Sequence, residues 1–318
     1  MKVVCDAHIP FLLEAVQKEW PQAEIIPLKP EQIDSSSIRE ADVLVIRTRT
    51  KVDERLLSGS SVRLVCTATI GYDHIDTAYC EAHHIRWMSC PGCNAQAVCD
   101  YIKEALEEIQ NSKFKIQNSS PTIGIVGVGH VGSLVAQMAE RRGMNVLLND
   151  PPKGIGVSLD CIAQNSDIIT FHVPLEESTY HLCDEHFLAQ CKPDALIINA
   201  ARGGVVDEAA LLRSGRPYIL DTWENEPNIN KDVLAHALRA SMHIAGYSVD
   251  GKRNATQMCL NEIAEVFGFK RIDISAYRYN GITASHKENN EPWLAAITQS
   301  LKAHPELFEN LRKNYPLR

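Results

Sequence analysis

The stretch Thr122-Ile123-Gly124-Ile125-Val126-Gly127-Val128-Gly129-His130-Val131-Gly132 decides the fold. It opens with a short apolar run, continues with three glycines spaced G-x-G-x-x-G, and ends where a helix would begin. This is the order of a dinucleotide-binding strand–turn–helix unit. In such a unit Gly127 permits the tight turn, Gly129 lets the backbone approach a pyrophosphate, and Gly132 allows close helix packing. Amides at the helix N-terminus then face the anionic phosphates.

An acidic residue after the next apolar run specifies the cofactor. Residues 145–148 form that run, and Asp150 follows 18 residues after Gly132 (from 132 to 150). The spacing is near that of the acid that accepts hydrogen bonds from the adenosine ribose hydroxyls. A carboxylate there repels the additional phosphate of NADP, so the predicted cofactor is NAD. A structural turn followed by a chance acid is the alternative, and the combined pattern favours the cofactor site.

Apolar runs alternate with helix-length stretches on both sides of the glycine loop. The expected strands are residues 3–5, 43–46, 64–66, 85–88, 123–126, 145–148, 167–171, 195–199 and 218–220, with 242–245 as a further short candidate. Expected helices include residues 10–20, 74–83, 94–109 and 249–267, and a polar linker spans residues 111–121. Strands separated by helices predict parallel βαβ units. We therefore expect an α/β fold of two Rossmann-like domains, with parallel sheets flanked by helices and a ligand cleft between them.

The bulk properties exclude several other classes. A length of 318 residues suits about two domains. The formal charge of −8 disfavours a nucleic-acid surface, which requires a basic stripe. No apolar run reaches the roughly 18 residues of a membrane span, and the N-terminus lacks the pattern of an export signal. We expect a cytoplasmic protein with no nucleic-acid or membrane partner.

The ten cysteines are expected to be reduced structural thiols. Cys90 and Cys93 have the spacing of a redox or zinc pair, but no second pair at metal-site spacing accompanies them. Cysteine beside an apolar segment behaves as a small buried hydrophobe, and this applies to Cys5, Cys66, Cys161 and Cys191. We therefore expect no metal site and leave a redox role of this pair open.

Three polar segments follow expected strands, where open α/β sheets bind their ligands. They are Asn199-Ala200-Ala201-Arg202-Gly203-Gly204, Asp221-Thr222-Trp223-Glu224-Asn225-Glu226-Pro227 and His243-Ile244-Ala245-Gly246-Tyr247. An arginine facing a cleft can bind a carboxylate through two hydrogen bonds. A histidine can exchange a proton with a substrate hydroxyl while a carboxylate holds it. On chemistry alone, a structural histidine remains the commoner alternative.

Together these segments resemble the D-2-hydroxyacid dehydrogenase superfamily, whose members have an arginine in an N-A-x-R-G segment, a glutamate before proline and a later histidine. The resemblance implies that Arg202 orients the substrate carboxylate and reacting oxygen. His243 would take the hydroxyl proton, and Glu226 would pair with His243 and favour its charged form. Glu224 is the competitor for that last role and is expected to be a surface side chain.

The resemblance also implies the set of residues that line the NAD site. Asp221 and Gly246 match positions at its nicotinamide end, and Val173 stands where a threonine can contact the cofactor. The full set implied is Gly127, Gly129, His130, Val131, Gly132, Asp150, Val173, Ala200, Ala201, Arg202, Asp221 and Gly246.

A narrower resemblance concerns one branch of that superfamily, whose members oxidise 4-phospho-D-erythronate in pyridoxal phosphate (vitamin B6) biosynthesis. It covers roughly residues 1–270 and is carried by Arg47-Thr48-Arg49-Thr50, Pro91-Gly92-Cys93-Asn94 and the extended histidine segment. It implies that Thr48, Thr69 and Tyr247 contact a small phosphorylated hydroxy acid. Alternatively, Thr48 or Thr69 caps the helix that follows its strand. The phosphate ligands stay open, with Arg47 and Arg312 as candidates.

The branch also implies the domain organisation. A discontinuous substrate domain would comprise residues 1–93 plus 248–270, an NAD-binding domain residues 94–247, and a shortened dimerisation-type segment residues 271–318. In that last segment we expect a possible strand and two helical stretches, around Trp293 and Leu307. A homodimer is implied.

Two other functions stay open from the sequence. One is another D-2-hydroxyacid dehydrogenase, of the phosphoglycerate or hydroxypyruvate/glycerate type. The other is a non-catalytic NAD-sensing binding protein, because a fold does not by itself fix function.

Overall fold

The computed structural model describes residues 1–110, 119–281, 283 and 292–318. The chain divides into two compact units, and each is described by itself. The first comprises Met1–Asn94 and Tyr247–Thr283, and the second comprises Ala95–Gly246 and Ala284–Arg318.

The first unit contains a five-stranded parallel sheet in the order β2-β1-β3-β4-β5. Its strands are β1 (Lys2–Asp6), β2 (Glu24–Leu28), β3 (Val43–Ile46), β4 (Leu64–Thr67) and β5 (Arg86–Met88). Its helices are α1 (Leu12–Glu19), α2 (Glu54–Leu57), α3 (Thr77–Ala82) and α10 (Val249–Phe267). Successive strand side chains point to opposite faces. Alternate residues of β1 therefore enter two separate cores, one shared with α1 and α10 and the other with α2 and α3.

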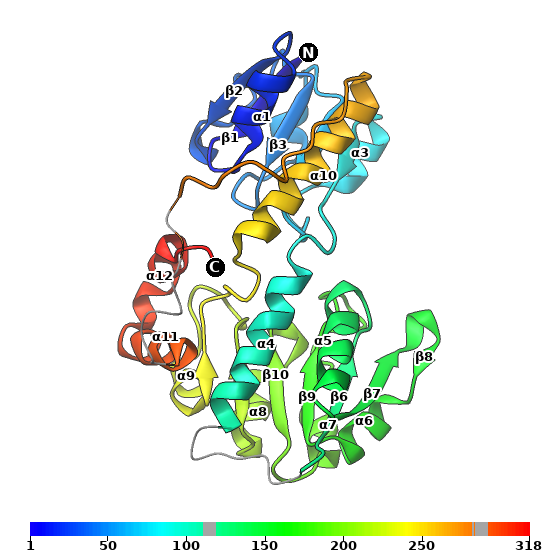
Figure 1. The fold of residues 1–318 in the computed structure, drawn as a ribbon, viewed down its shortest axis with the longest axis vertical. Coiled ribbons are helices and arrows are strands. Elements are labelled where there is room, and N and C mark those ends of the chain that lie inside the picture. The colour runs from blue at the N-terminus through cyan, green and yellow to red at the C-terminus, as the bar shows by residue number, and fades with distance from the viewer. Residues whose placement is uncertain (111–118, 282, 284–291) are drawn as a thin grey trace. The chain divides into compact units, whose positions relative to one another are not determined.

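The second unit contains a seven-stranded sheet in the order β12-β11-β10-β9-β6-β7-β8, parallel except for the antiparallel pair β7 and β8. Figure 1 labels the part of this sheet from β10 to β8. Its strands are β6 (Thr122–Val126), β7 (Asn145–Asp150), β8 (Ile155–Gly156), β9 (Ile168–Phe171), β10 (Leu196–Asn199), β11 (Tyr218–Leu220) and β12 (Arg239–Ala240). Its helices are α4 (Ala95–Gln110), α5 (His130–Arg141), α6 (Leu159–Asn165), α7 (Glu185–Gln190), α8 (Glu208–Ser214), α9 (Lys231–His236), α11 (Trp293–Ala303) and α12 (Phe308–Asn314).

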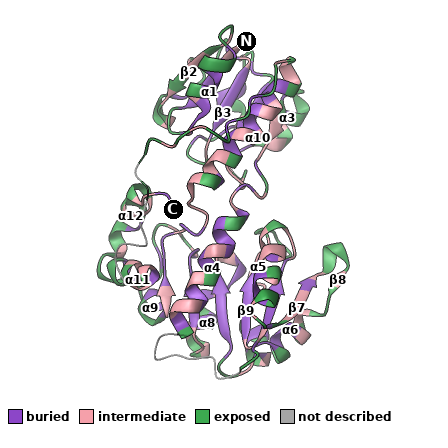
Figure 2. Ribbon diagram, in the orientation of Figure 1, coloured by how far each residue is buried: buried purple, intermediate pink, exposed green. Residues whose placement is uncertain are grey.

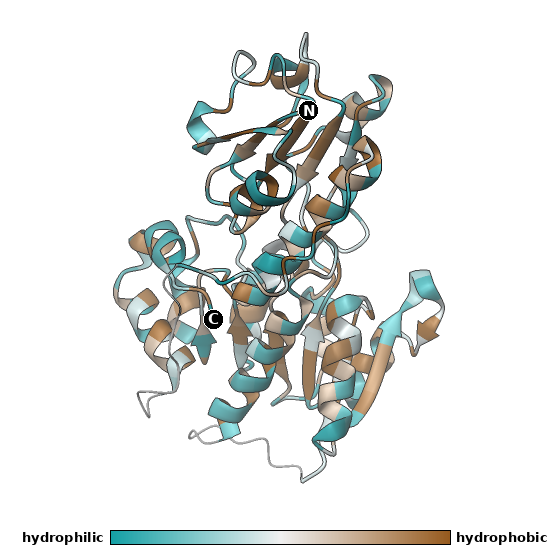
Figure 3. Cartoon of the chain, turned by 45° about the horizontal axis from the view of Figure 1, so that its top comes forward, coloured by the Kyte–Doolittle hydropathy of each residue, from teal (hydrophilic) through white to brown (hydrophobic). Residues whose placement is uncertain are grey.

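Burial follows the apolar pattern of the strands. The central strands of both sheets are buried (Figure 2) and strongly hydrophobic (Figure 3). In the second unit, α4, α5 and α11 share one core with β6, β9, β10 and β11. Burying this apolar surface stabilises each unit at about 25 cal/mol per Å² removed from water. The expected α/β fold with parallel sheets and flanking helices is confirmed.

Several expectations about individual elements were wrong. Residues 242–245 form a loop rather than a strand, because the Ile244 and Ala245 amides bond to the Asp221 carboxylate instead of a neighbouring strand. Among the described residues the last strand is β12. Residues 271–281 form no strand either. Edge strand β2 was not expected, because its mixed exposure and Pro27 hide the pattern of a buried strand. Of the predicted linker, residues 111–118 lie outside the described residues.

Candidate functional site

The glycine loop lies between β6 and α5 in a shape that only glycine permits at two positions. Gly127 has φ 91°, and a Cβ there would lie 2.7 Å from the backbone carbonyl of His172. A Cβ on Gly132 would lie 2.0 Å from the carbonyl oxygen of Gly127. The first turn of α5 therefore packs directly on the loop.

The same loop presents an open backbone surface at Gly129. The nearest atom to a Cβ at this position would be the Lys153 Nζ, 4.0 Å away. Gly129 is the N-cap of α5, whose first amides lack helical partners and favour an anion. The loop therefore fits a pyrophosphate, as its sequence predicts.

Asp150 ends β7 beside this loop. One of its carboxylate oxygens, Oδ2, accepts a hydrogen bond from the Val128 amide at 2.9 Å and lies 3.3 Å from the Lys153 Nζ. Lys153 also donates to the Val128 carbonyl at 2.8 Å. An acid held at the end of the second strand suits the ribose of a dinucleotide. Lys153 was not among the predicted site residues, although it follows Asp150 by only three residues in the sequence.

The other positions assigned to the cofactor are distributed around the loop and the strand ends. Val173 borders the glycine turn, since its Cγ1 would lie 2.9 Å from a Cβ on Gly127. His130 is exposed at the start of α5, and the partly exposed positions are Val131, Val173, Ala200, Ala201, Arg202 and Gly246.

His243 and Glu226 form a close pair in the second unit. The His243 Nδ1 lies 2.9 Å from the Glu226 Oε2, and the two side chains are 30% and 19% exposed. The other oxygen of Glu226 accepts a hydrogen bond from the Trp223 amide at 2.9 Å. With Nδ1 directed at a carboxylate, Nε2 is the ring nitrogen that can exchange a proton with a substrate.

The surroundings of Glu226 favour its charged form. Burial, the largest single influence, opposes ionisation. The His243 hydrogen bond and charge, the Trp223 amide and the Arg312 guanidinium outweigh it and lower the pKa of Glu226. Arg312, on α12, has its Nη1 3.9 Å from the Glu226 Oε2. Arg312, a candidate phosphate ligand, thus lies beside the His243–Glu226 pair, and its contact with Glu226 was not predicted from the sequence.

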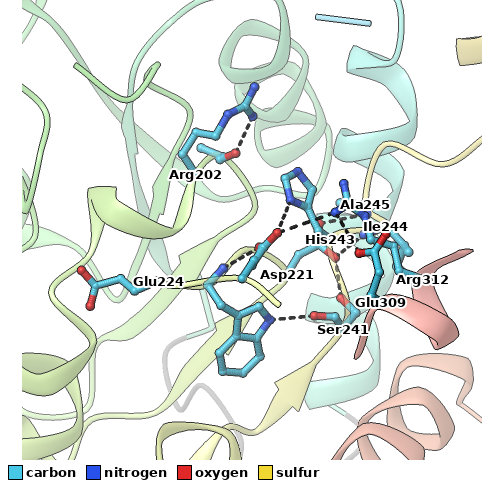
Figure 4. A network of polar contacts seen from close by, with 12 residues as sticks. Arg202, Asp221, Glu224, Ser241, His243, Ile244, Ala245, Glu309 and Arg312 are labelled. Carbon is cyan, nitrogen blue, oxygen red and sulfur yellow. Dashed lines mark hydrogen bonds and ion pairs between the residues drawn. The ribbon is translucent and has the colours of Figure 1, made fainter. Parts of the chain in front are cut away.

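Asp221 holds the segment that carries His243. Its buried carboxylate accepts hydrogen bonds from the Ser241 hydroxyl at 2.7 Å, the Ile244 amide at 2.8 Å and the Ala245 amide at 2.9 Å. The His243 amide donates to the Asp221 carbonyl at 2.7 Å, and His243 itself has φ 58°. These bonds fix an unfavourable left-handed conformation at His243 (Figure 4).

Arg202 follows β10 and is partly exposed. Its Nη1 donates to the Ala201 carbonyl at 2.8 Å, and the Asn199 side chain donates to the Arg202 carbonyl at 2.7 Å. A guanidinium placed in this way retains donors for a carboxylate ligand.

Glu224 is directed away from His243 (Figure 4) and pairs instead with His181, whose Nε2 lies 2.5 Å from the Glu224 Oε1. The expectation of a surface side chain was wrong, because Glu224 is only 22% exposed and is held by this contact. Its place in the sequence, two residues before Glu226, gave no sign of a partner 43 residues away.

Thr48, Thr69 and Tyr247 belong to the first unit. Thr48 is exposed, and the Thr69 hydroxyl donates to the Gly71 carbonyl at 2.9 Å. Tyr247 is partly exposed, with the Lys252 Nζ 5.2 Å from its ring centre. The capping alternative for both threonines was wrong, because aspartates, Asp53 and Asp76, cap α2 and α3.

Arg47, the other candidate phosphate ligand, pairs with the buried Asp6, with its Nε 2.7 Å from the Asp6 Oδ2.

All ten cysteines are free thiols, and nine of them are buried. The Cys90 and Cys259 sulfur atoms lie 3.8 Å apart, and burial raises the pKa of Cys93 to about 12. Among the described residues no cluster of three potential metal ligands occurs, and no helix is long and apolar enough to cross a membrane.

Comparisons with known proteins agree with this geometry. Residues 96–248 match the family described as "D-isomer specific 2-hydroxyacid dehydrogenase, NAD binding domain". The chain is similar to the erythronate-4-phosphate dehydrogenase of Bacteroides fragilis, with 42% identity across 100% of this chain and 97% of that protein. It is also 39% identical to the enzyme of the same name from Porphyromonas gingivalis, across 99% and 92%.

Among solved structures, the chain is similar to the NAD⁺-bound 3-phosphoglycerate dehydrogenase of Entamoeba histolytica. The TM-score is 0.72 and the identity 23%, over 84% of this chain and 95% of that one. At this identity the likeness shows the fold alone.

Proposed function

The chain belongs to the erythronate-4-phosphate dehydrogenase family of D-2-hydroxyacid dehydrogenases, and on this premise we propose that it oxidises 4-phospho-D-erythronate with NAD. The product is the 2-oxo acid 3-hydroxy-2-oxo-4-phosphooxybutanoate, an intermediate on the route to pyridoxal 5'-phosphate. The observation that carries the proposal is the His243–Glu226 pair, a general base already oriented by a carboxylate.

The residues of the second unit divide the chemistry among them. NAD, when bound at the glycine loop and Asp150, supplies the hydride acceptor. The Nε2 of His243 takes the proton of the substrate 2-hydroxyl, and Glu226 stabilises the imidazolium that results. Arg202 orients the substrate carboxylate and the reacting oxygen through its fixed fork of donors.

The substrate contacts and the larger organisation complete the proposal. Thr48 and Thr69 supply substrate contacts from a domain of residues 1–93 plus 248–270, and Tyr247 supplies one from the end of the NAD-binding domain. Residues 94–247 bind NAD, and residues 271–318 take part in a homodimer of a cytoplasmic enzyme.

The α/β units described support these boundaries in part, since the compact division also breaks near residues 94 and 247. It differs in the last segment, where residues 284–318 group with the second unit. Contacts there include the Thr298 hydroxyl, which accepts a hydrogen bond from the Ala240 amide at 2.9 Å.

Turnover tests the substrate. Initial rates with NAD should give a far higher kcat/KM for 4-phospho-D-erythronate than for 3-phosphoglycerate or glycerate. The reverse ranking would replace our substrate with that of another 2-hydroxyacid dehydrogenase.

The His243→Ala variant tests the mechanism. We expect kcat to fall by about 10²- to 10⁴-fold, as for the loss of a general base, with NAD affinity by calorimetry unchanged. His236→Ala is the matched control, since His236 lies on α9 with its Nδ1 2.8 Å from the Asp232 carbonyl. Full turnover in His243→Ala would refute the assignment, and an inactive wild-type chain that binds NAD would favour the NAD-sensing alternative.

A further inference from the structure

The peptide bond between Trp223 and Glu224 is enclosed on one side by Gly203. A Cβ on Gly203 would lie 1.9 Å from the Trp223 carbonyl oxygen and 2.6 Å from the Glu224 amide nitrogen. Gly203 adjoins Arg202, and Trp223 donates its own amide to Glu226. This peptide therefore joins the loop that carries the arginine to the loop that carries the glutamate of the proposed site.

Glu208 makes a second contact to this peptide. Its side chain is only 3% exposed, at the first position of α8, and its Oε1 accepts the Glu224 amide hydrogen bond at 2.7 Å. Burying a carboxyl group costs free energy unless the group is hydrogen-bonded, and here its partner is a main-chain amide of a neighbouring loop. The Glu224 side chain does not provide an alternative anchor near Glu226, because it pairs with His181.

We propose that Glu208 is a positioning residue of the dehydrogenase site. It holds the Trp223–Glu224 peptide against Gly203 and so fixes the positions of Arg202 and Glu226 relative to each other. This inference rests on the proposed function, in which Arg202 and Glu226 act on the substrate. Glu208 itself touches no reacting atom in this role. Its effect is on kcat, because a misplacement of about 1 Å at a reacting group can cost about 10²-fold in rate.

The charge state of Glu208 is sensitive to pH. Burial raises its pKa to about 7, the Glu224 amide opposes that rise, and the carboxylates of Glu224 and Glu226 add to it. Burial raises the pKa of the Tyr218 phenol, on β11, and the charge of Glu208 adds to that rise. On its own element Asp207 precedes it as the N-cap of α8.

These neighbours set the sign of the pH effect. Below its raised pKa the carboxyl is neutral and still accepts the amide hydrogen bond. Above that pKa it adds a negative charge near Glu226. Added negative charge keeps more of a nearby imidazole protonated before the reaction, and only the unprotonated ring can accept the substrate proton.

Two substitutions separate positioning from charge. Glu208→Ala removes the acceptor, and we expect kcat to fall about tenfold or more, with KM for NAD changed less than about twofold. Glu208→Gln keeps a neutral acceptor, and we expect it to retain kcat within about twofold. Because Gln does not ionise, its kcat should rise more steeply with pH across about 7 than that of the wild-type chain.

Glu185→Gln is the matched control. Glu185 is likewise the first residue of its helix, α7, after an aspartate N-cap, but its side chain is 80% exposed and pairs with Arg213. It should leave kcat and the pH profile unchanged.

A Glu208→Ala enzyme with wild-type kcat overturns the proposal. So does a Glu208→Gln enzyme with a lowered kcat or with the wild-type pH profile, and this second result stands even where Glu208→Ala does not fold. Failure of the proposed function is seen separately, as undiminished turnover by His243→Ala.

Discussion

Replacing Asp221 by asparagine tests how the fold holds His243. The carboxylate of Asp221 accepts three hydrogen bonds, two of them from main-chain amides of the His243 loop. The Ser241 hydroxyl and the Ile244 amide bond to one oxygen, and the Ala245 amide bonds to the other. Asparagine has nearly the same shape, but it replaces one oxygen by an NH₂ group that only donates.

The hydrogen bonds of Asp221 determine how much local stability the substitution should remove. In either orientation of the new amide, its NH₂ group faces the N–H of Ile244 or of Ala245, so one buried main-chain donor loses its acceptor. Leaving such a group unsatisfied costs about 1–3 kcal/mol, and the remaining bonds lose their charge assistance. We expect a local loss of about 3 kcal/mol, which corresponds to about 100-fold faster amide exchange because 1.4 kcal/mol is about tenfold.

Two assays follow the effect from the loop to the reaction. Hydrogen exchange measured by NMR should show reduced protection at Ile244 and Ala245, and kcat should fall by about tenfold to 100-fold as His243 moves. Ser241→Ala is the control for the two amides, because it leaves both bonded to Asp221. It also removes the partner of the buried Tyr101 hydroxyl, 2.7 Å from the Ser241 hydroxyl, so its loss of global stability should be about 1–3 kcal/mol while the local protection of Ile244 and Ala245 is retained. Unchanged protection of both amides in Asp221→Asn, with wild-type kcat, would refute the reasoning.

Two further predictions concern the two units separately. Gly132→Ala places a Cβ 2.0 Å from the Gly127 carbonyl oxygen, so we expect NAD affinity measured by calorimetry to fall at least about tenfold; unchanged affinity would show that the loop accommodates the methyl group. In the first unit, burial opposes the ionisation of Asp6, but hydrogen bonds from Arg47 and His8 and the charge of Arg47 lower the pKa of Asp6. The ionised carboxylate therefore stabilises the fold above about pH 4, and this stabilisation is lost as the pH falls through the lowered pKa. Arg47→Met should lower the free energy of unfolding, measured with urea, by about 3 kcal/mol near pH 7. It should also make that free energy depend less on pH in the acid range, and a pH dependence parallel to that of the wild-type chain would contradict this.

Local patterns were sufficient where one strand and its neighbouring turn decide the structure. The glycine loop, Asp150 and the buried strands follow from apolar runs of strand length and from positions that only glycine tolerates. The same patterns failed at β2 and at residues 242–245. A proline-containing edge strand lacks a continuous apolar run, and an apolar segment can be buried as a loop when a carboxylate such as Asp221 bonds its amides.

The site residues show the same division. Arg202, Glu226 and His243 were found by residue type and by resemblance, and the structure places Glu226 in contact with His243. Glu208 was missed, because after Asp207 it has the pattern of an ordinary acidic residue in the first turn of a helix. Its burial and its bond to the Glu224 amide, 16 residues away, are visible only in the fold.

The sequence alone determined the α/β class, the NAD loop and the family, since these depend on residues close together along the chain. Only the tertiary structure decided which carboxylate holds His243, where Glu224 lies, and what fixes the loops that carry Arg202 and Glu226. Those pairings join residues distant in sequence, and their strength comes from burial, which removes competing water from each hydrogen bond. The number and type of polar residues in the sequence do not specify which of them will be brought together in that way.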